Sequence, residues 1–113
     1  MVKNRNYLPE KGDIIWLSFS PTKGHEQSGR RPGLVISDKS FNQTSMALVV
    51  PITSALRKYE THVSFQTENI NGTVLCDHIR SIDWSKRDVA YIGPIPGHIL
   101  SKVKNIVASL ILS

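Results

Sequence analysis

The chain has 113 residues, of which 40% are hydrophobic and 20% charged, a composition typical of one globular domain. Lys and Arg outnumber Asp and Glu by 14 to 9, and the formal net charge of +5 favours a polyanionic partner such as nucleic acid. The sequence disfavours a membrane span and a secretion signal, because it has no long apolar run and its start, Met1 to Arg5, is polar and basic. The single cysteine, Cys76, excludes an intramolecular disulfide and suits a reducing cytoplasm.

The N-terminal half of the chain predicts three strands. Residues 1–10 are expected to form a loosely ordered extension of the single domain that spans residues 1–113. Apolar runs rich in β-forming residues predict strands over 13–19, 33–37 and 46–52. Pro51 has no backbone N–H, so we expect the hydrogen-bonded ladder to break there.

The C-terminal half predicts three more strands and one helix. Residues 61–65 alternate in polarity, the β-rich run 73–84 follows an Asn-Gly turn signal at 71–72, and 91–95 forms a short final strand. A helix is predicted to begin near Pro96, because apolar residues recur there at spacings of four and three. Its apolar face holds Ile99, Val103, Ile106, Val107 and Leu110, and its polar face Lys102, Asn105 and Ser109.

Five to seven short strands closed by one terminal helix predict a mainly β fold, a small and strongly bent antiparallel barrel. We expect Trp16, Trp84 and Cys76 in its core, the cysteine as a buried thiol and not a nucleophile. His62 and His98 are assigned to surface or packing positions. Because so small a barrel encloses little volume, a pocket for a polymer forms more easily between two copies, which favours a homodimer.

The segment from Gly24 to Pro32 places a histidine, a glutamate, a glutamine and two arginines between glycines. Glycine lets the backbone approach a ligand closely, and arginine presents a planar fork of donors that matches phosphate oxygens. The ordinary alternative is a solvated loop, but the connection from about Ser20 to Arg30 is longer than most hairpin loops, and loops of that length tend to be either functional or disordered. Basic residues at predicted strand ends and loops indicate an anion groove: Arg30, Arg31, Arg57, Lys58, Arg80, Lys86 and Arg87.

Several motifs follow one another along the chain: GDIIW at 12–16, PTKGHEQ at 21–27, GRRP at 29–32, VPIT at 50–53 and VLCDHIRSID at 74–83. Their order and spacing resemble the MazF/PemK/ChpB family of type II toxin endoribonucleases, and the likeness runs from about Gly12 to Ser113. The resemblance implies an SH3-like barrel and a homodimer whose catalytic groups line a groove at the subunit interface. It also implies a cognate antitoxin, whose extended C-terminal segment occupies that groove and through whose complex the toxin meets DNA only indirectly.

The sequence shows none of the ligand spacings of common metal sites, such as His-Glu-x-x-His, Asp-x-Asp or Cys-x-x-Cys. RNA can be cleaved without a metal, because its own 2′-hydroxyl attacks the adjacent phosphorus when a base, an acid and an electrostatic stabiliser are present. We therefore predict a metal-independent endoribonuclease without a cofactor, which cuts single-stranded mRNA at short motifs. The expected ends are a 2′,3′-cyclic phosphate and a 5′-hydroxyl, and the expected consequence is growth arrest.

Arg31 is the residue expected to clamp the scissile phosphate, because Pro32 holds the start of its strand rigid. The family resemblance implies that Thr53, at the end of the next strand, donates its hydroxyl to a phosphoryl oxygen beside Arg31. Either residue could instead be an ordinary surface residue at a strand end.

The role of general base or charge stabiliser is shared among three titratable residues, and the sequence leaves the choice open: His25, Glu26 and Asp77. PemK-like relatives have an arginine where this chain has Leu75, so an acid role at that position is lost. The proton partner would then be Arg31 or His25. Two further loop residues are expected to contact RNA together with the basic residues above: Lys23 and Gln27.

Two other functions fit the same predicted fold. CcdB-like toxins share the barrel but bind DNA gyrase and are not enzymes; they end in a Trp-Gly-Ile tail, whereas this chain ends in LILS at 110–113. A catalytically silent RNA-binding barrel would keep the basic loops and would tolerate the loss of Arg31.

Overall fold

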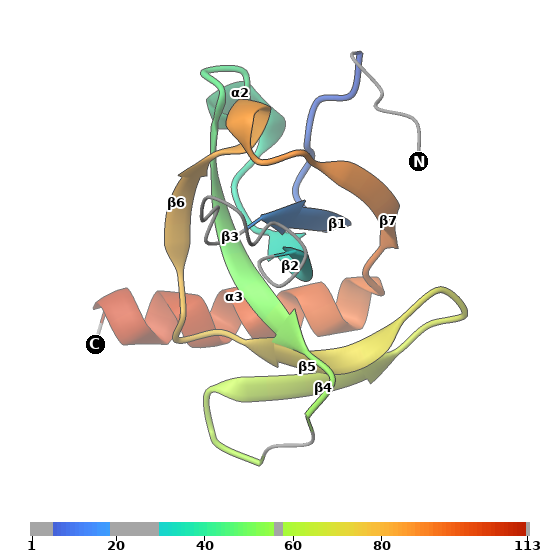
Figure 1. The fold of residues 1–113 in the computed structure, drawn as a ribbon. Coiled ribbons are helices and arrows are strands. Elements are labelled where there is room, and N and C mark those ends of the chain that lie inside the picture. The colour runs from blue at the N-terminus through green and yellow to red at the C-terminus, as the bar shows by residue number, and fades with distance from the viewer. Residues whose placement is uncertain (1–5, 19–29, 56–57, 113) are drawn as a thin grey trace.

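The seven strands of the described residues form one antiparallel sheet in the order β4-β5-β3-β2-β1-β7, with β6 pairing to β3 outside that path. The structure is a computed structural model, which describes residues 6–18, 30–55 and 58–112. Figure 1 shows the sheet curled into a half-barrel with helix α3 beside it, which confirms the predicted fold class. The elements are β1 (Asp13–Ser18), β2 (Arg30–Val35), α2 (Lys39–Asn42), β3 (Met46–Thr53), β4 (His62–Gln66), β5 (Asn71–Leu75), β6 (Arg80–Asp83), the 3-10 helix η1 (Trp84–Lys86), β7 (Ala90–Pro94) and α3 (Gly97–Leu112).

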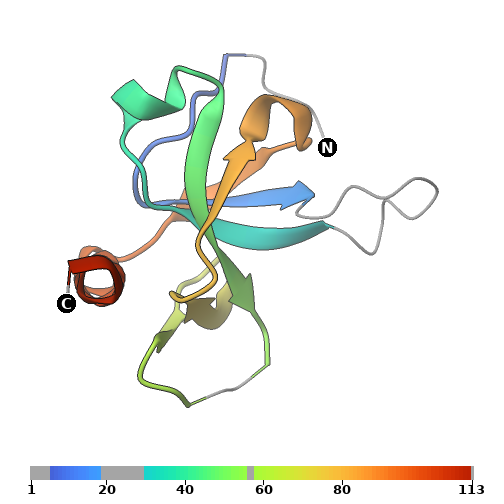
Figure 2. The ribbon, with the colours of Figure 1, turned by 90° about the vertical axis from the view of Figure 1, so that its left-hand side faces the viewer.

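Strand β3 belongs to both halves of the sheet, and it crosses the molecule from the α2 side to the β4–β5 hairpin (Figure 2). Its first residues, Met46 to Val49, pair with β6, and its last, Ile52 and Thr53, pair with β5. The predicted break at Pro51 is therefore a change of partner and not an end of the strand, since Pro51 itself stays in register opposite Gly33 of β2. The missing N–H of proline costs nothing at the point where one neighbour gives way to the next.

The predicted strand over 73–84 is in fact two strands. β5 ends at Leu75 and β6 begins at Arg80, because each pairs with a different half of β3. The start of β2 also differs, since the strand begins at Arg30 and not at the predicted Gly33.

The Asn-Gly pair at 71–72 does not form the predicted turn, because both residues lie in β5. The hairpin turn lies before them, where the backbone N–H of Thr67 donates to the carbonyl of Ile70 at 3.0 Å. A Cβ at residue 72 would lie 2.6 Å from Ile52 Cγ2 and 3.0 Å from the Thr53 carbonyl oxygen. Glycine is thus required for the close approach of β5 to the end of β3.

Two apolar clusters fill the molecule, and β1 lies between them. Its side chains alternate, so Ile14 enters the first cluster while Ile15 and Leu17 enter the second. The first cluster consists of Ile14, Leu34, Val50, Ile52, Val63, Phe65, Val74, Cys76, Ile95, Ile99 and Val103. The second consists of Ile15, Leu17, Val35, Ala47, Val49 and Ile82.

Helix α3 packs on the first cluster with only part of its predicted apolar face. Ile99 and Val103 are buried, and Ile106 and Val107 pack against the cluster from its margin. Leu110 was expected on this face but is 48% exposed, because the helix runs on past the sheet (Figure 1). Within the described residues no helix combines the length and the apolar character that crossing a membrane would need.

Residues 6–10 are packed on the barrel, in contrast to the loose extension expected over 1–10; residues 1–5 lie outside the described part. The Tyr7 hydroxyl donates to Asp13 Oδ2 at 2.6 Å, and Pro9 is fully buried. Burial, followed by this hydrogen bond, raises the pKa of Tyr7, and burial also raises the pKa of Asp13. The segment therefore belongs to the folded domain from about Tyr7 onward.

Asn42, at the end of the unpredicted helix α2, joins several segments. Its Nδ2 donates to the carbonyls of Pro9 at 2.8 Å and Ser37 at 3.1 Å, and its Oδ1 accepts from the Ser37 hydroxyl at 2.5 Å. Its own backbone carbonyl accepts from Trp84 Nε1 at 2.9 Å. The side chain is fully buried, so each bond replaces one that water would otherwise make.

Asn42→Ala should lower the free energy of unfolding by roughly 2–4 kcal/mol, because it leaves buried carbonyls without a donor. Urea denaturation followed by circular dichroism measures the change. Gln43→Ala is the matched control, since Gln43 is adjacent and exposed, and it should stay within about 0.5 kcal/mol of the wild type. Equal stability of the two variants would contradict the role given to Asn42.

Candidate active site

A cavity of about 360 Å³ lies where β2 begins and β3 ends, beside the β4–β5 turn and β7. Its lining combines cationic, hydroxyl, amide and apolar groups: Trp16, Arg30, Arg31, Pro32, Ile52, Thr53, Ser54, Asn69, Ile70 and Ile92. The size is at the lower end of the range of ligand pockets, about 300–1,000 Å³, and fits one small unit of a larger substrate.

Arg31 and Thr53 are brought together by the pairing of β2 with β3. The register places Gly33 opposite Pro51, and its continuation by two residues places Arg31 opposite Thr53. Residues opposite each other in an antiparallel pair share a face of the sheet, and both line the cavity. Thr53 Oγ1 accepts from the N–H of Ala55 at 3.1 Å, so its hydroxyl hydrogen is left to donate elsewhere. The lining of one cavity thus contains both an exposed arginine and a hydroxyl donor.

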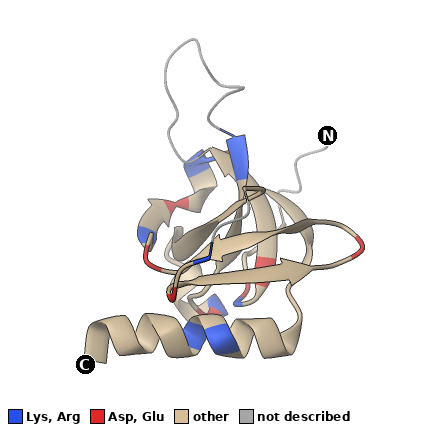
Figure 3. Cartoon of the chain, turned by 90° about the horizontal axis from the view of Figure 1, so that it is seen from below, with Lys and Arg blue, Asp and Glu red and all other residues tan. Residues whose placement is uncertain are grey.

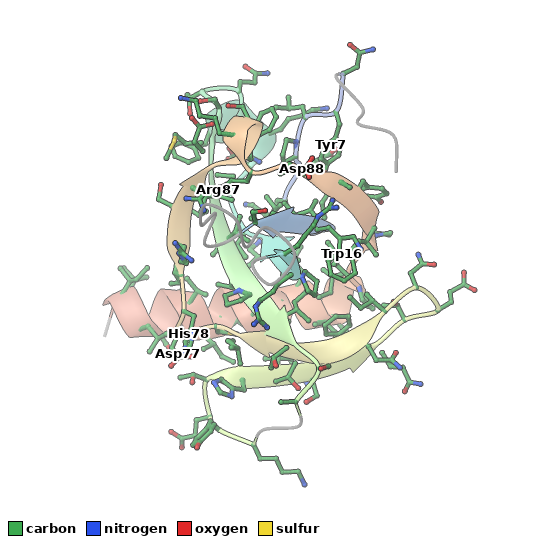
Figure 4. All side chains as sticks on the ribbon, viewed as in Figure 1. Tyr7, Trp16, Asp77, His78, Arg87 and Asp88 are labelled. Atoms are coloured by element: carbon green, nitrogen blue, oxygen red, sulfur yellow. The ribbon has the colours of Figure 1, made fainter. Side chains whose placement is uncertain are left out.

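Arg30 also lines the cavity, but its guanidinium is held by Asp88, in the connection between η1 and β7. Its Nη2 donates to the Asp88 carbonyl at 3.2 Å, and its Nη1 lies 4.0 Å from Asp88 Oδ2. Next to it, Arg87 Nη1 donates to the Ser18 carbonyl at 2.9 Å, and the Ser18 N–H donates to the Arg87 carbonyl at 3.0 Å. Figure 4 labels Arg87 and Asp88 in this position. These contacts fasten the ends of β1 and β2 to the η1–β7 connection.

Asp77 does not line this cavity; it lies in the turn between β5 and β6, near His78 (Figure 4). Its Oδ1 is 3.4 Å from Nε2 of His62, and its Oδ2 is 3.9 Å from Nε2 of His78. The His62 side chain is only 5% exposed, and the Tyr59 ring packs edge-on against it with 4.9 Å between ring centroids. Within one chain the structure therefore pairs Asp77 with His62 and not with Arg31 or Thr53.

The other predicted site residues are divided between exposed surface and the undescribed segments. Lys58, Arg80 and Lys86 are exposed and do not line the cavity. In Figure 3 basic residues lie at the start of β2, beside the undescribed segment, and again on α3. The remaining predicted residues lie outside the described part of the chain: Lys23, His25, Glu26, Gln27 and Arg57. Over the described ranges no group of three or more His, Cys, Asp and Glu side chains could hold a metal ion.

The two tryptophans, both expected in the core, are only partly buried. Trp84 packs on the margin of the second cluster. Trp16 lies on the same face of β1 as Ile14, two residues further along the strand. At that point the first cluster ends and the cavity begins. The strand pattern placed Trp16 in the core because Trp16 shares a face of the strand with the buried Ile14. Its position near the end of the strand was the one sequence feature that pointed to the cavity.

Cys76 is fully buried beyond the end of β5, as predicted for a small apolar residue. Burial, and then the negative charge of Asp77, raise the pKa of its thiol to about 11. The reactive thiolate is therefore scarce at neutral pH.

The Cys76 thiol should react slowly with a disulfide reagent such as dithiobis-nitrobenzoate at pH 8. With its pKa near 11, the thiolate fraction is on the order of one in a thousand, and burial denies access. Absorbance of the released thiol measures the rate, and the urea-unfolded protein is the control. Native and unfolded protein reacting equally fast would contradict the burial.

The structure closely resembles solved MazF toxins. MazF from Deinococcus radiodurans superposes with a TM-score of 0.84 at 37% identity, over 94% of this chain and 98% of that one. The complex of MazE with MazF from the same organism contains a chain that superposes with a TM-score of 0.83 at 32% identity, over 95% and 98%. The fold is therefore that of a MazF-like toxin.

A family model described as PemK-like, MazF-like toxin of type II toxin-antitoxin system matches residues 10–111, and the chain belongs to this family. The endoribonuclease toxin MazF of Escherichia coli strain K12 is 37% identical over 99 residues, which cover 87% of this chain and 89% of that protein. The Escherichia coli endoribonuclease PemK is 37% identical over 100 residues, with 83% and 75% covered. The predicted class, a type II toxin endoribonuclease, is confirmed, and the CcdB-like alternative is not favoured.

Proposed function

We propose that the protein cleaves single-stranded RNA at short motifs in mRNA, without a metal or cofactor, and so inhibits translation and growth in the cytoplasm. The observation that carries the proposal is that Arg31 and Thr53 both line one cavity, in a chain of this toxin family. A cation and a hydroxyl donor on one cavity wall suit a phosphodiester, whose two non-bridging oxygens each accept hydrogen bonds.

In the proposed reaction the 2′-oxygen of the ribose attacks the adjacent phosphorus, and the bond from phosphorus to the 5′-oxygen breaks. The products are a 2′,3′-cyclic phosphate and a 5′-hydroxyl. Arg31 binds the non-bridging oxygens, on which charge accumulates in the transition state, and Thr53 donates its hydroxyl to one of them. One side chain takes the proton of the 2′-hydroxyl, and a second acid gives a proton to the leaving 5′-oxygen.

The position of Asp77 away from the cavity bears on which residue acts as the general base. Because Asp77 pairs with His62 away from the cavity, the base that serves Arg31 and Thr53 of the same chain is proposed to be His25 or Glu26. Asp77 keeps a role only if a second protomer brings it to the cavity. Arg30 is proposed to contact the RNA backbone from the same cavity wall as Arg31.

We propose that the active form is a homodimer and that an antitoxin occupies its groove with an extended segment. The support is the small volume of the cavity in one chain, about 360 Å³, together with the MazE–MazF complexes of Deinococcus radiodurans. The remaining proposed RNA contacts around that groove are Lys23, Gln27, Arg57, Lys58, Arg80, Lys86 and Arg87.

Sedimentation equilibrium should give twice the 12.6 kDa of one chain, and a monomer at micromolar concentration would contradict the dimer.

Arg31→Ala and Thr53→Ala should slow RNA cleavage, Arg31→Ala by about 100- to 1,000-fold, the cost of losing one donor to the transition state. The assay incubates purified protein with mixed-sequence RNA in EDTA and maps the fragment ends. Lys104→Ala is the control, since it removes an exposed positive charge on α3 away from the cavity, and it should cleave at the wild-type rate.

Three outcomes would contradict the proposed function. RNA that stays intact with the wild type, or that is cut only after Mg²⁺ is added, would exclude metal-independent cleavage. Wild-type rates in Arg31→Ala would exclude the proposed phosphate clamp. DNA breaks that depend on gyrase would instead support the CcdB-like alternative.

A further inference from the structure

The hydrogen-bonded path of the sheet ends in two edge strands, β4 and β7, which differ in how they are protected. β7 ends at Pro94, and its register against β1 shifts partway along the pair. The side-chain amide of Asn69 also donates to the Ile92 carbonyl of this strand at 3.4 Å. Prolines, bulges and covering side chains are usual means by which proteins stop an edge strand from pairing with another chain.

Strand β4 has none of these features. Its sequence, HVSFQ, contains no proline, lysine, arginine, aspartate or glutamate. Its five residues pair with β5 in one unbroken register, from His62 opposite Leu75 to Gln66 opposite Asn71. Within the described residues no strand pairs with its other side. A regular edge strand without such protection is a template for a further strand.

The register shows which backbone groups of β4 are open. In an antiparallel pair, residues that exchange hydrogen bonds with the partner strand alternate with residues whose N–H and C=O point outward. Just before β4, the N–H of Cys76 donates to the carbonyl of Thr61 at 3.0 Å, so the odd-numbered residues of this ladder bond to β5. Ser64 and Gln66 therefore direct their N–H and C=O groups away from β5. Both residues are exposed, and no described residue bonds to these backbone groups.

A cavity of about 400 Å³ lies along this edge, between β4 and α3. The two elements contribute equally to its lining, which consists of His62, Val63, Ser64, Lys102, Asn105 and Ile106. Because consecutive residues of a strand point to opposite faces, a cavity that is lined by three in a row lies at the edge of the strand. Figure 3 shows α3 running alongside the β4–β5 hairpin, with its basic residues near the middle of the helix.

The charge of this groove favours an acidic partner. Lys102 forms no ion pair with the described residues, and the lining contains no aspartate or glutamate. The chain as a whole carries a formal charge of +5. A second copy of this chain is a poor occupant, because a two-fold pairing of β4 with β4 would place two Lys102 side chains in one groove.

We infer that the outer edge of β4 binds an extended polypeptide segment as an additional strand, with an acidic side chain of that segment beside Lys102. The backbone groups of Ser64 and Gln66 supply the hydrogen bonds of such a pairing, and the groove beside α3 selects the side chain. This surface shares no lining residue with the cavity that holds Arg31 and Thr53. The inference therefore does not depend on RNA cleavage.

The first test selects peptides from a phage-displayed library of random decapeptides against the wild-type protein. The selected peptides should be enriched in aspartate or glutamate and in β-branched residues. Fluorescence anisotropy of the labelled synthetic peptides then measures their affinity for each variant, and the melting temperature of each variant reports its folding.

Ser64→Pro should weaken peptide binding by about 10-fold or more, because proline has no N–H to donate at the open edge. An edge strand tolerates proline where the N–H points outward, so the fold should persist. Ser64→Ala is the matched control. It removes the same hydroxyl, which lies 3.0 Å from Thr73 Oγ1, but it keeps the backbone N–H and should bind like the wild type.

Lys102→Ala should weaken binding by about 2- to 5-fold, the contribution of an exposed ion pair. Lys104→Ala is the control, because it removes the same charge two residues further along α3, outside the lining, and it should bind like the wild type. Exchanging the acidic residue of the peptide for its amide should cause the same loss with the wild type. It should cause no further loss with Lys102→Ala.

Amide hydrogen exchange locates the contact without any substitution. In the free protein the N–H groups of Ser64 and Gln66 should exchange quickly, whereas those of Val63 and Phe65 should be protected by β5. A selected peptide should slow the exchange of Ser64 and Gln66.

Several results would overturn the inference: a library that yields no binders, binders without acidic enrichment, equal binding by Ser64→Pro and Ser64→Ala, or unchanged exchange at residues 64 and 66. If Lys102→Ala weakens the binding of RNA but not of the selected peptides, the surface belongs to RNA and the inference falls. Arg31→Ala should bind the peptides like the wild type, and a loss there would assign them to the other cavity. A wild type that binds these peptides but leaves RNA intact would refute only the proposed function.

Discussion

The molecule depends on one strand that serves two neighbours in succession. β3 pairs with β6 over its first half and with β5 over its last two residues, while β2 remains on its other side. The change of partner turns a flat meander into a curled sheet and brings the β4–β5 hairpin around toward β7. Thr53 stands at the end of this strand, so its place opposite Arg31 is set by the same pairing that sets the fold.

The site is also built before any ligand binds. Arg30 and Arg87 tie the ends of β1 and β2 to the η1–β7 connection, and Asn69 ties the β4–β5 turn to β7. Each contact joins segments that are distant in sequence, and each lies at the border of the cavity. Preorganised groups of this kind stabilise charge without being reordered during the reaction.

The strands and the helix could be predicted because their buried residues recur at the spacings of a strand or a helix. The alternation of Ile14, Ile15 and Leu17 between two clusters, and the repeat of Ile99 and Val103 on α3, are direct consequences of pleat and helix geometry. Motif order singled out Arg31 and Thr53, and both residues line the cavity. These features are local, or depend on one neighbouring strand.

What could not be predicted depends on contacts across the chain. Asn-Gly at 71–72 is a strong turn signal, but here Gly72 is required for space against Ile52. The pairing of His62 with Asp77 follows from the register of the β4–β5 hairpin. The sequence did not predict this register, because it placed the hairpin turn at residues 71–72. The apolar end of α3 and the position of Trp16 at the cavity depend on where the sheet stops, which no periodicity encodes.

The tight contacts at Gly72 and Gly93 have a consequence for how this protein can diverge. An added methyl group would collide with Ile52 and the Thr53 carbonyl oxygen at residue 72, and it would meet the amide of Asn69 at residue 93. Gly72 approaches the backbone of Thr53, so it constrains the frame more than Gly93, where the amide of Asn69 can move aside. Substitutions that alter the cavity are therefore tolerated more easily among its lining side chains than at residue 72.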